Sequence, residues 1–209
     1  MPTLLTDVPQ VPIPPVPVRK RRTREQCLSL EASGLFEREK LELVDGELIS
    51  KMGKNRPPVK AFTWMHRWLV ETPAWQFVNA AAPIDVSPAD NVWSEPEPDL
   101  IVPKRDFATF DANPQPEDLD LVVEIGDSTP KFDLTVKAAL YARAAISEYW
   151  VLDVESRRLI VHRSPVSGNY SSVAVYAENE FVAPLAAPQA QFSGRRCIHS
   201  LTMQREQEI

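Results

Sequence analysis

The stretch that decides the fold reads LVVEIGDSTPKFDLTVK, residues 121–137. Its first five residues predict a buried strand, but a carboxylate, Glu124, interrupts the apolar run. A buried charge without a partner costs several kcal/mol, so a strand that served only the core would carry an apolar residue there. Asp133 and Lys137 follow one turn apart on the next predicted helix. We therefore expect Glu124 to have a binding partner.

The segments on either side alternate between strand and helix. DLIVP (99–103) predicts a short buried strand, a helix is expected over 133–145, and YWVLDV (149–154) and LIVHR (159–163) predict two further strands. A strand, a helix and a strand in succession imply a right-handed crossover and at least one parallel strand pair. The pattern therefore predicts a mixed α/β (α+β) fold.

The flanking sequence predicts smaller elements. A short helix is expected over 23–30, a hairpin over 41–50 and a longer helix over 57–71, with a further strand at SSVAVYA (171–177). Trp64 and Trp68 stand four residues apart on the longer helix and therefore lie on one stripe. Such a pair is more typical of a core or a subunit interface than of a platform for stacking bases.

Length and composition favour one domain with tails. The 209 residues suffice for a single core, and 44% hydrophobic with 25% charged residues is normal for a globular protein. No apolar run is long enough to span a membrane. Residues 1–22 are rich in proline and basic side chains, and we expect them to be disordered. We place the domain at 23–200 and expect a second disordered tail at 201–209.

Charge and cysteine content exclude some functions. A net charge of −6 argues against a protein that coats nucleic acid by electrostatics alone, although a site with a bound cation remains compatible with it. Cys27 and Cys197 lie far apart, which argues against a disulfide scaffold and against a zinc site. Met1 leads into proline-rich sequence rather than a signal peptide. The cytoplasm is the expected location.

Two acids and a lysine form the candidate site. Asp99 opens one predicted strand, Glu124 lies toward the end of the next, and Lys137 lies on the helix that follows. If the strands are neighbours, the two carboxylates and the backbone carbonyl of Ile125 can share one divalent cation. That arrangement is the outline of a hydrolytic site.

The helix allows a second interpretation. Asp133, Lys137 and Tyr141 recur at four-residue intervals and so share one face. They can support the site, or Asp133 and Lys137 can form an ordinary ion pair on a solvated surface. Spacing alone leaves both interpretations open.

Four blocks of sequence together resemble a known family. PDL (98–100), LVVEIGDSTPKFDLTVKAALYA (121–142), SEYWVLDV (147–154) and LELVDGEL (41–48) are similar in order and spacing to the Uma family (Uma-two) of restriction-type endonucleases, within the PD-(D/E)XK nuclease superfamily. The likeness covers roughly residues 23–165. It implies a restriction-endonuclease-like core, with a mixed central β-sheet flanked by helices.

The resemblance also implies residue roles. Asp99 matches the acid of the PD element, Glu124 matches the acid of the ExK element, and Glu42 matches the glutamate of the early hairpin. Gly126 stands where the usual lysine is expected, and Lys137 on the helix takes over that role.

Three further residues are implied as supporting ones. Glu47 lies in the same block as the hairpin glutamate, Asp133 matches an acid ahead of the lysine, and Tyr141 follows on the same helix face. The family often has a histidine at the start of its second helix, but NRPPVKAF (55–62) has none.

The function implied is Mg²⁺-dependent hydrolysis of nucleic-acid phosphodiester bonds, with DNA as the expected substrate and Mn²⁺ as an alternative metal. Asp99 and Glu124 would hold the metal, Lys137 would serve the attacking water, and Glu42 would assist. A homodimer is expected, because cleavage of both strands favours paired sites.

Two other functions remain open. A catalytically silent module of the same fold would bind nucleic acid or protein without cutting it. A glycoside hydrolase would use Asp99 and Glu124 as general acid and base, but it gives Lys137 no role. A serine hydrolase is disfavoured, because no GxSxG motif is present.

Overall fold

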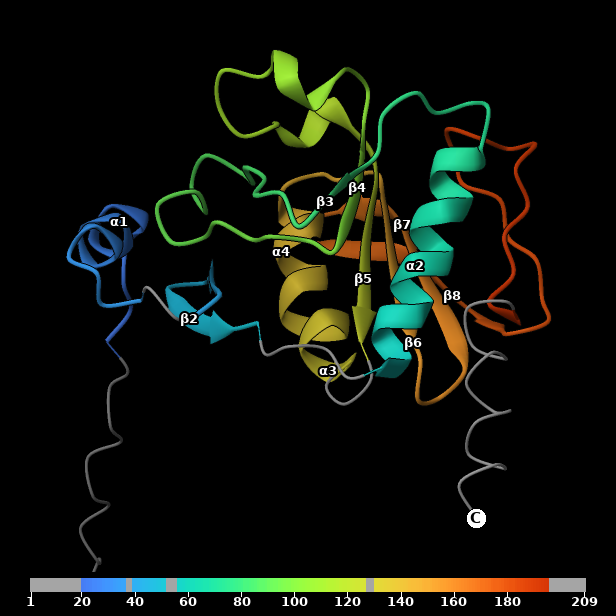
Figure 1. Cartoon of the computed structure of the whole chain (residues 1–209), viewed down its shortest axis with the longest axis horizontal. Coiled ribbons are helices and arrows are strands. Elements are labelled where there is room, and N and C mark those ends of the chain that lie inside the picture. The colour runs from blue at the N-terminus through green and yellow to red at the C-terminus, as the bar shows by residue number, and fades with distance from the viewer. Residues whose placement is uncertain (1–19, 37–38, 52–55, 127–129, 196–209) are drawn as a thin grey trace, which may run out of the picture.

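A computed structural model describes residues 20–36, 39–51, 56–126 and 130–195 (Figure 1). Its centre is a six-stranded sheet in which the strands are neighbours in chain order. These are β3 (Asn79–Ala80), β4 (Leu100–Pro103), β5 (Leu119–Gly126), β6 (Glu148–Asp153), β7 (Arg158–Val166) and β8 (Asn169–Ala177). The predicted buried strands and the strand near the C-terminal end are all present.

The sheet is mixed. β5 and β6 pair in parallel, and every other neighbouring pair is antiparallel. The parallel pair is joined by one helical crossover, which consists of α3 (Pro130–Phe132), the π-helical segment η3 (Asp133–Lys137) and α4 (Ala138–Arg143). The predicted crossover and the mixed α/β class are confirmed.

Helices cover both faces of the sheet (Figure 1). α2 (Arg56–Glu71) lies on one face, where Met65 and Leu69 join a buried apolar cluster with strand residues of β4 to β7. The crossover helices lie on the other face. Because side chains alternate along a strand, Val123 of β5 faces α2, whereas Val122 faces the crossover. Glu124 shares the parity of Val122 and therefore also faces the crossover.

Both tryptophans of α2 pack against the core under this helix. The ring centroid of Trp68 lies 6.1 Å from that of Trp150 and 4.8 Å from that of Phe192. Phe192 belongs to the segment after β8, which forms an isolated bridge between Val182 and Phe192 and closes over this face. The prediction that the tryptophan pair is structural is confirmed for the core.

A separate unit lies on the side of the crossover helix (Figure 1). α1 (Arg24–Ala32) begins at a capping box, in which the Thr23 side chain and Gln26 satisfy each other's backbone N–H groups. β1 (Leu41–Val44) and β2 (Glu47–Ser50) form a two-stranded sheet of their own. Asp45 and Gly46 make the turn with φ of 47° and 81°, as a two-residue hairpin turn requires.

The linker between β4 and β5 contains two short 3-10 helices, η1 (Phe107–Thr109) and η2 (Pro116–Asp118). Residues 1–19, 37–38, 52–55, 127–129 and 196–209 lie outside the described residues, and with them most of the first predicted tail and all of the second. Within the ranges described, no helix is long and apolar enough to cross a membrane.

Candidate active site

Strand pairing places the two predicted acids beside each other. β4 runs antiparallel to β5 with Leu100 opposite Val123, so Asp99, one residue before β4, lies next to Glu124. Both side chains are buried, with 8% of Asp99 and 4% of Glu124 exposed. The carboxylates therefore converge at one end of the sheet, under the crossover helix.

Asp99 is held by the backbone of the neighbouring strand. The amide of Ile125 donates a hydrogen bond to Asp99 Oδ2 over 2.7 Å. This contact fixes the carboxylate against β5 at the level of Glu124. The carbonyl of Ile125, the third predicted metal ligand, belongs to the same stretch of strand.

Lys137 lies between two glutamates. Its Nζ is 2.8 Å from Glu124 Oε1 and 2.8 Å from Glu42 Oε1, and only 2% of the residue is exposed. Asp133 Oδ1 lies at 3.9 Å, one helical turn before. The lysine therefore joins the sheet, the hairpin and the crossover helix in one buried ionic cluster.

Tyr141 lies on the same helical face as Lys137. Its hydroxyl donates to Glu124 Oε1 over 3.2 Å, so this oxygen accepts from both side chains. Burial, together with the negative charges of Glu124 and Glu42, raises the pKa of Tyr141 well above its ordinary value. The phenol therefore stays neutral and acts as a hydrogen-bond donor.

Glu42 enters the site from the hairpin. Its Oε2 accepts a hydrogen bond from the backbone amide of Glu97 over 3.1 Å, while its Oε1 contacts Lys137. The side chain of Lys51 in turn donates to the carbonyl of Glu97. The proline-flanked segment before Asp99 thus orients the hairpin glutamate.

The charges in the cluster are out of balance. Burial raises the pKa of Glu124, Lys137 lowers it, and Asp99, Asp133 and Glu42 raise it further, to about 8. Burial alone would lower the pKa of Lys137, but the surrounding carboxylates outweigh it and raise this pKa. The Nζ of Lys137 thus lies 2.8 to 3.9 Å from three acidic side chains, those of Glu42, Glu124 and Asp133, and this excess of acids is compatible with an additional cation.

The chemistry of the donor set fits Mg²⁺. Carboxylate oxygens of Asp99 and Glu124 and the carbonyl of Ile125 are hard ligands of the kind that this ion prefers. Across the described ranges, no three His, Cys, Asp or Glu side chains already surround a point that could hold a metal ion. In this arrangement the ammonium of Lys137, bound to Glu124 Oε1, provides the local positive charge.

The sequence pattern of the Uma2 family, described as "Putative restriction endonuclease", matches residues 24–203. The chain belongs to the Uma2 family. No curated protein matches it.

The structure of another protein shows the same fold. A crystal structure of a protein from Anabaena variabilis, described as a putative nuclease, superposes with a TM-score of 0.63 at 16% sequence identity. The match covers 85% of this chain and 97% of that one. The restriction-endonuclease-like core that the resemblance implied is thereby confirmed as the fold of this Uma2 protein.

The structure of this Uma2 protein brings together Asp99, Glu124, Lys137 and Glu42, with Asp133 and Tyr141 around them. Glu47, by contrast, is exposed on β2.

Two features of the site were missed from the sequence. One is the π-helical turn over Asp133–Lys137, which replaces the start of the regular helix expected over 133–145. Such turns are frequent at functional sites, but apolar periodicity does not reveal a single widened turn. The other is the amide of Glu97, since backbone groups carry no sequence signal. The proline-rich run EPEP was the only hint of an irregular approach to Asp99.

Proposed function

We propose that this protein is a Mg²⁺-dependent endonuclease that hydrolyses phosphodiester bonds of DNA. The observation that carries the proposal is Lys137 Nζ lying 2.8 Å from both Glu42 and Glu124, with Asp99 beside Glu124 on the next strand. Membership of a family described as putative restriction endonucleases supports a nuclease function. Mn²⁺ as a substitute metal and a homodimer as the active species belong to the same proposal.

Each residue has a distinct role in this scheme. Asp99, Glu124 and the carbonyl of Ile125 would hold the metal, which supplies Lewis-acid chemistry and positive charge toward a phosphate. Lys137 donates a hydrogen bond to the attacking water and faces the negative charge that develops on the phosphate. Glu42 holds the ammonium of Lys137 in place from the opposite side.

The supporting residues fix the acids. Tyr141 donates to Glu124 Oε1 and the amide of Ile125 donates to Asp99 Oδ2, so each acid has one oxygen fixed by a neutral donor. Glu124 and Glu42 raise the pKa of the Lys137 ammonium most, and Asp133, at 3.9 Å from Nζ, adds to their effect. A carboxylate with one oxygen fixed in this way needs little reorganisation to take part in a reaction.

A silent binding module is the second candidate, because one observation favours it. Lys137 already pairs with Glu42 and Glu124, so the cluster is partly neutralised by the protein itself. A descendant that had lost catalysis would keep this ion pair for stability alone. The two candidates differ in whether a divalent cation binds.

Calorimetric titration of Mg²⁺ and Mn²⁺ tests the proposal, with cleavage of supercoiled plasmid measured on the same samples. Glu124→Gln and Asp99→Asn should abolish metal binding and lower the cleavage rate by at least about a hundredfold. Glu178→Gln is the control, because this acid pairs with Arg157 at the end of β8.

Three results would each overturn one part of the proposal. If Glu124→Gln still cleaves the plasmid, the assigned site is wrong. If the protein binds metal but leaves the plasmid intact, DNA is not the substrate and only other nucleic acids remain. Absence of both binding and cleavage would favour the silent module.

A further inference from the structure

The hairpin that carries Glu42 needs an external support. Among the described residues, β1 and β2 pair with each other and make one further bridge, between Leu43 and Glu95. A two-stranded hairpin is marginally stable by itself in water. Yet Glu42 must lie 2.8 Å from Lys137, which is fixed on the crossover helix. Contacts at the hairpin turn provide this support.

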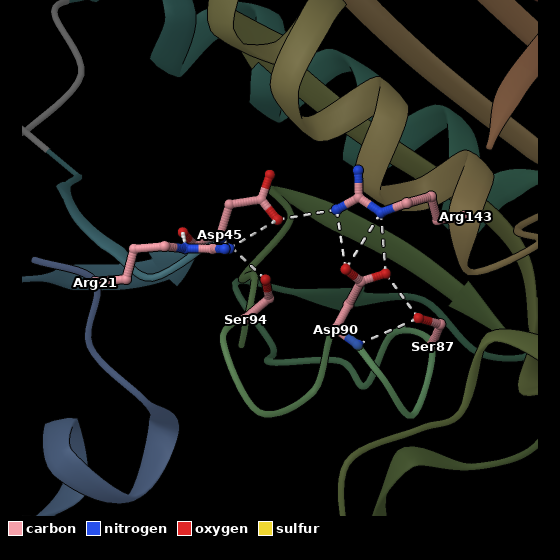
Figure 2. Close-up of polar contacts among 6 residues, drawn as sticks. All are labelled: Arg21, Asp45, Ser87, Asp90, Ser94 and Arg143. Carbon is pink, nitrogen blue, oxygen red and sulfur yellow. Dashed lines mark hydrogen bonds and ion pairs between the residues drawn. The ribbon is translucent and has the colours of Figure 1, made fainter. Parts of the chain in front are cut away.

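Arg143, the last residue of α4, makes the central contact (Figure 2). Its Nη2 donates to Asp45 Oδ1 in the hairpin turn over 2.9 Å. Its Nε and Nη2 also donate to both oxygens of Asp90, over 3.0 to 3.2 Å. One guanidinium therefore joins α4, the hairpin turn and the loop that contains Asp90, with the fork geometry that arginine provides.

The partners of Arg143 are themselves held in place (Figure 2). Ser87 Oγ donates to Asp90 Oδ2 over 2.6 Å, and Ser94 Oγ accepts from the amide of Asp45 over 3.0 Å. Hydrogen bonds from Arg143 and Ser87 outweigh the effect of partial burial and lower the pKa of Asp90. Asp90 is therefore a charged partner of Arg143 at neutral pH.

The segment that precedes α1 joins from the other side. Arg21 Nε donates to the carbonyl of Asp45 over 2.6 Å, and its guanidinium lies 5.0 Å from the ring centroid of Trp93. The amide of Arg22 donates to the carbonyl of Gly46 over 2.9 Å. The hairpin turn is thus enclosed by α4, by the loop at Asp90 and by the start of the described chain.

Two ionic contacts connect the hairpin to the crossover helix, in addition to the apolar packing of Val44 and Ile49 in a buried cluster that α4 also lines. Lys137 contacts Glu42, and Arg143, six residues later and about 9 Å along the helix, contacts Asp45. The contact at Arg143 therefore holds the turn end of the hairpin, while the contact at Lys137 holds Glu42 itself.

We propose that Arg143 is a positioning residue, whose contacts with Asp45 and Asp90 set the place of Glu42 in the active site. The inference rests on the proposed nuclease function for its catalytic readout. Its structural readout, the order of the hairpin, is independent of that function.

The catalytic test compares Arg143→Gln in two backgrounds. In the otherwise unchanged protein, kcat should fall by about tenfold while KM stays within about twofold, because misplaced catalytic groups lower the rate. In a Glu42→Gln background, the same change should lower kcat by less than about twofold. If Arg143→Gln lowers kcat by the same factor in both backgrounds, the proposal is overturned, because Arg143 would then act independently of Glu42.

Hydrogen exchange tests the positioning directly. Arg143→Gln should accelerate amide exchange in Leu41–Val44 by about tenfold and leave β5 and β6 unchanged. Unchanged hairpin exchange would overturn the inference even if the protein shows no cleavage. The nuclease proposal fails if the unaltered protein shows no cleavage. The positioning inference fails if hairpin exchange is unchanged, so the two failures can be told apart.

Two further variants keep the test decisive. Arg157→Gln is the matched control, because this arginine also binds a carboxylate through two nitrogens, in Glu178, at a similar exposure of 38% against 35% for Arg143. It should leave hairpin exchange unchanged. If Arg143→Gln does not fold, Asp90→Asn weakens the same contact and should accelerate hairpin exchange severalfold, and no acceleration would overturn the proposal.

Discussion

At the scale of single residues, the buried cluster around Lys137 is the feature on which the proposed function depends. The lysine is within 2.8 Å of Glu42 and Glu124, and each of these residues is almost inaccessible to solvent. Buried ion pairs contribute little net stability, but removal of one partner leaves a costly unpaired charge. The free energy of unfolding should therefore change strongly when one side chain of the cluster is replaced. The size and sign of the change should depend on whether the lysine or an acid is removed.

Replacement of the lysine tests this balance. Lys137→Met should lower the free energy of unfolding by about 3–5 kcal/mol, because two buried glutamates lose their ammonium. Adding Glu42→Gln and Glu124→Gln to the same chain should recover part of that loss. Denaturant unfolding measures both effects, with the exposed Lys104→Met as the control. Equal stability of Lys137→Met and the control would contradict the structure of the cluster.

His162 on β7 gives a pH-dependent prediction. Burial lowers its pKa from the ordinary value of 6.5, and a backbone hydrogen bond with Tyr149 opposes this only in part. Between the folded pKa and 6.5 the unfolded chain binds more protons, so stability present at higher pH is lost as the pH falls through this window.

The measurement compares melting temperatures at about pH 5.5 and about pH 7.5. The unaltered protein should lose more stability on acidification than His162→Phe, whose ring can pack against Tyr149 and Tyr170 in place of the imidazole. Identical pH profiles would mean that other groups account for the acid sensitivity.

At the scale of elements, the site depends on three pieces that meet at one end of the sheet. β4 and β5 bring the acids together through antiparallel pairing, the crossover supplies Lys137 and Tyr141, and the hairpin supplies Glu42. Among the described strands that contribute to the site, those of the hairpin lie outside the main sheet. The hairpin is therefore the piece that a local change displaces most easily.

Gly46 in the hairpin turn has φ of 81°, and a Cβ there would lie 2.7 Å from Cβ of Arg21. Gly46→Ala should therefore destabilise by about 1–2 kcal/mol from the backbone conformation alone, and the crowding should move the turn. Melting temperature and plasmid cleavage should both decrease. Gly34→Ala, at φ 78° after α1, meets the same backbone cost and should leave cleavage unchanged. Equal loss of cleavage in both variants would argue against a role for the turn.

At the scale of the whole molecule, the two faces of the sheet have different tasks. The face under α2 is mainly apolar, apart from the ion pair of the buried Glu148 with Arg163, and is closed by the segment that carries Phe192, whereas the other face carries the cluster around Lys137. Stability and catalysis should therefore be separable by substitutions on opposite faces.

Phe192 tests this separation. The side chain is 3% exposed and contacts Trp68 and Trp150, so Phe192→Ala should lower the free energy of unfolding by about 3–5 kcal/mol. At a temperature where the variant stays folded, kcat should match that of the unaltered protein. Phe181→Ala removes a ring that is 63% exposed and should be nearly neutral. A lower kcat for folded Phe192→Ala would contradict the separation.

The sequence by itself determined the order of the elements and the residues of the candidate site. Apolar runs and turn residues predicted the strands 99–103, 121–125 and 149–154, because burial of alternating or continuous apolar side chains is encoded locally. Glu124 stands out in the sequence because burial of a charge costs free energy, and the apolar neighbours in the strand cannot offset that cost.

Only the tertiary structure decided how those residues meet. Glu42 and Lys137 are 95 positions apart in the sequence, and Asp45 and Arg143 are 98 positions apart, yet each pair is in contact. The π-helical turn changes the geometry of a single helical turn. Pairing of this kind follows from strand register, from the hand of the crossover and from packing of the hairpin on the helix. These depend on the whole chain at once, so no local pattern in the sequence specifies them.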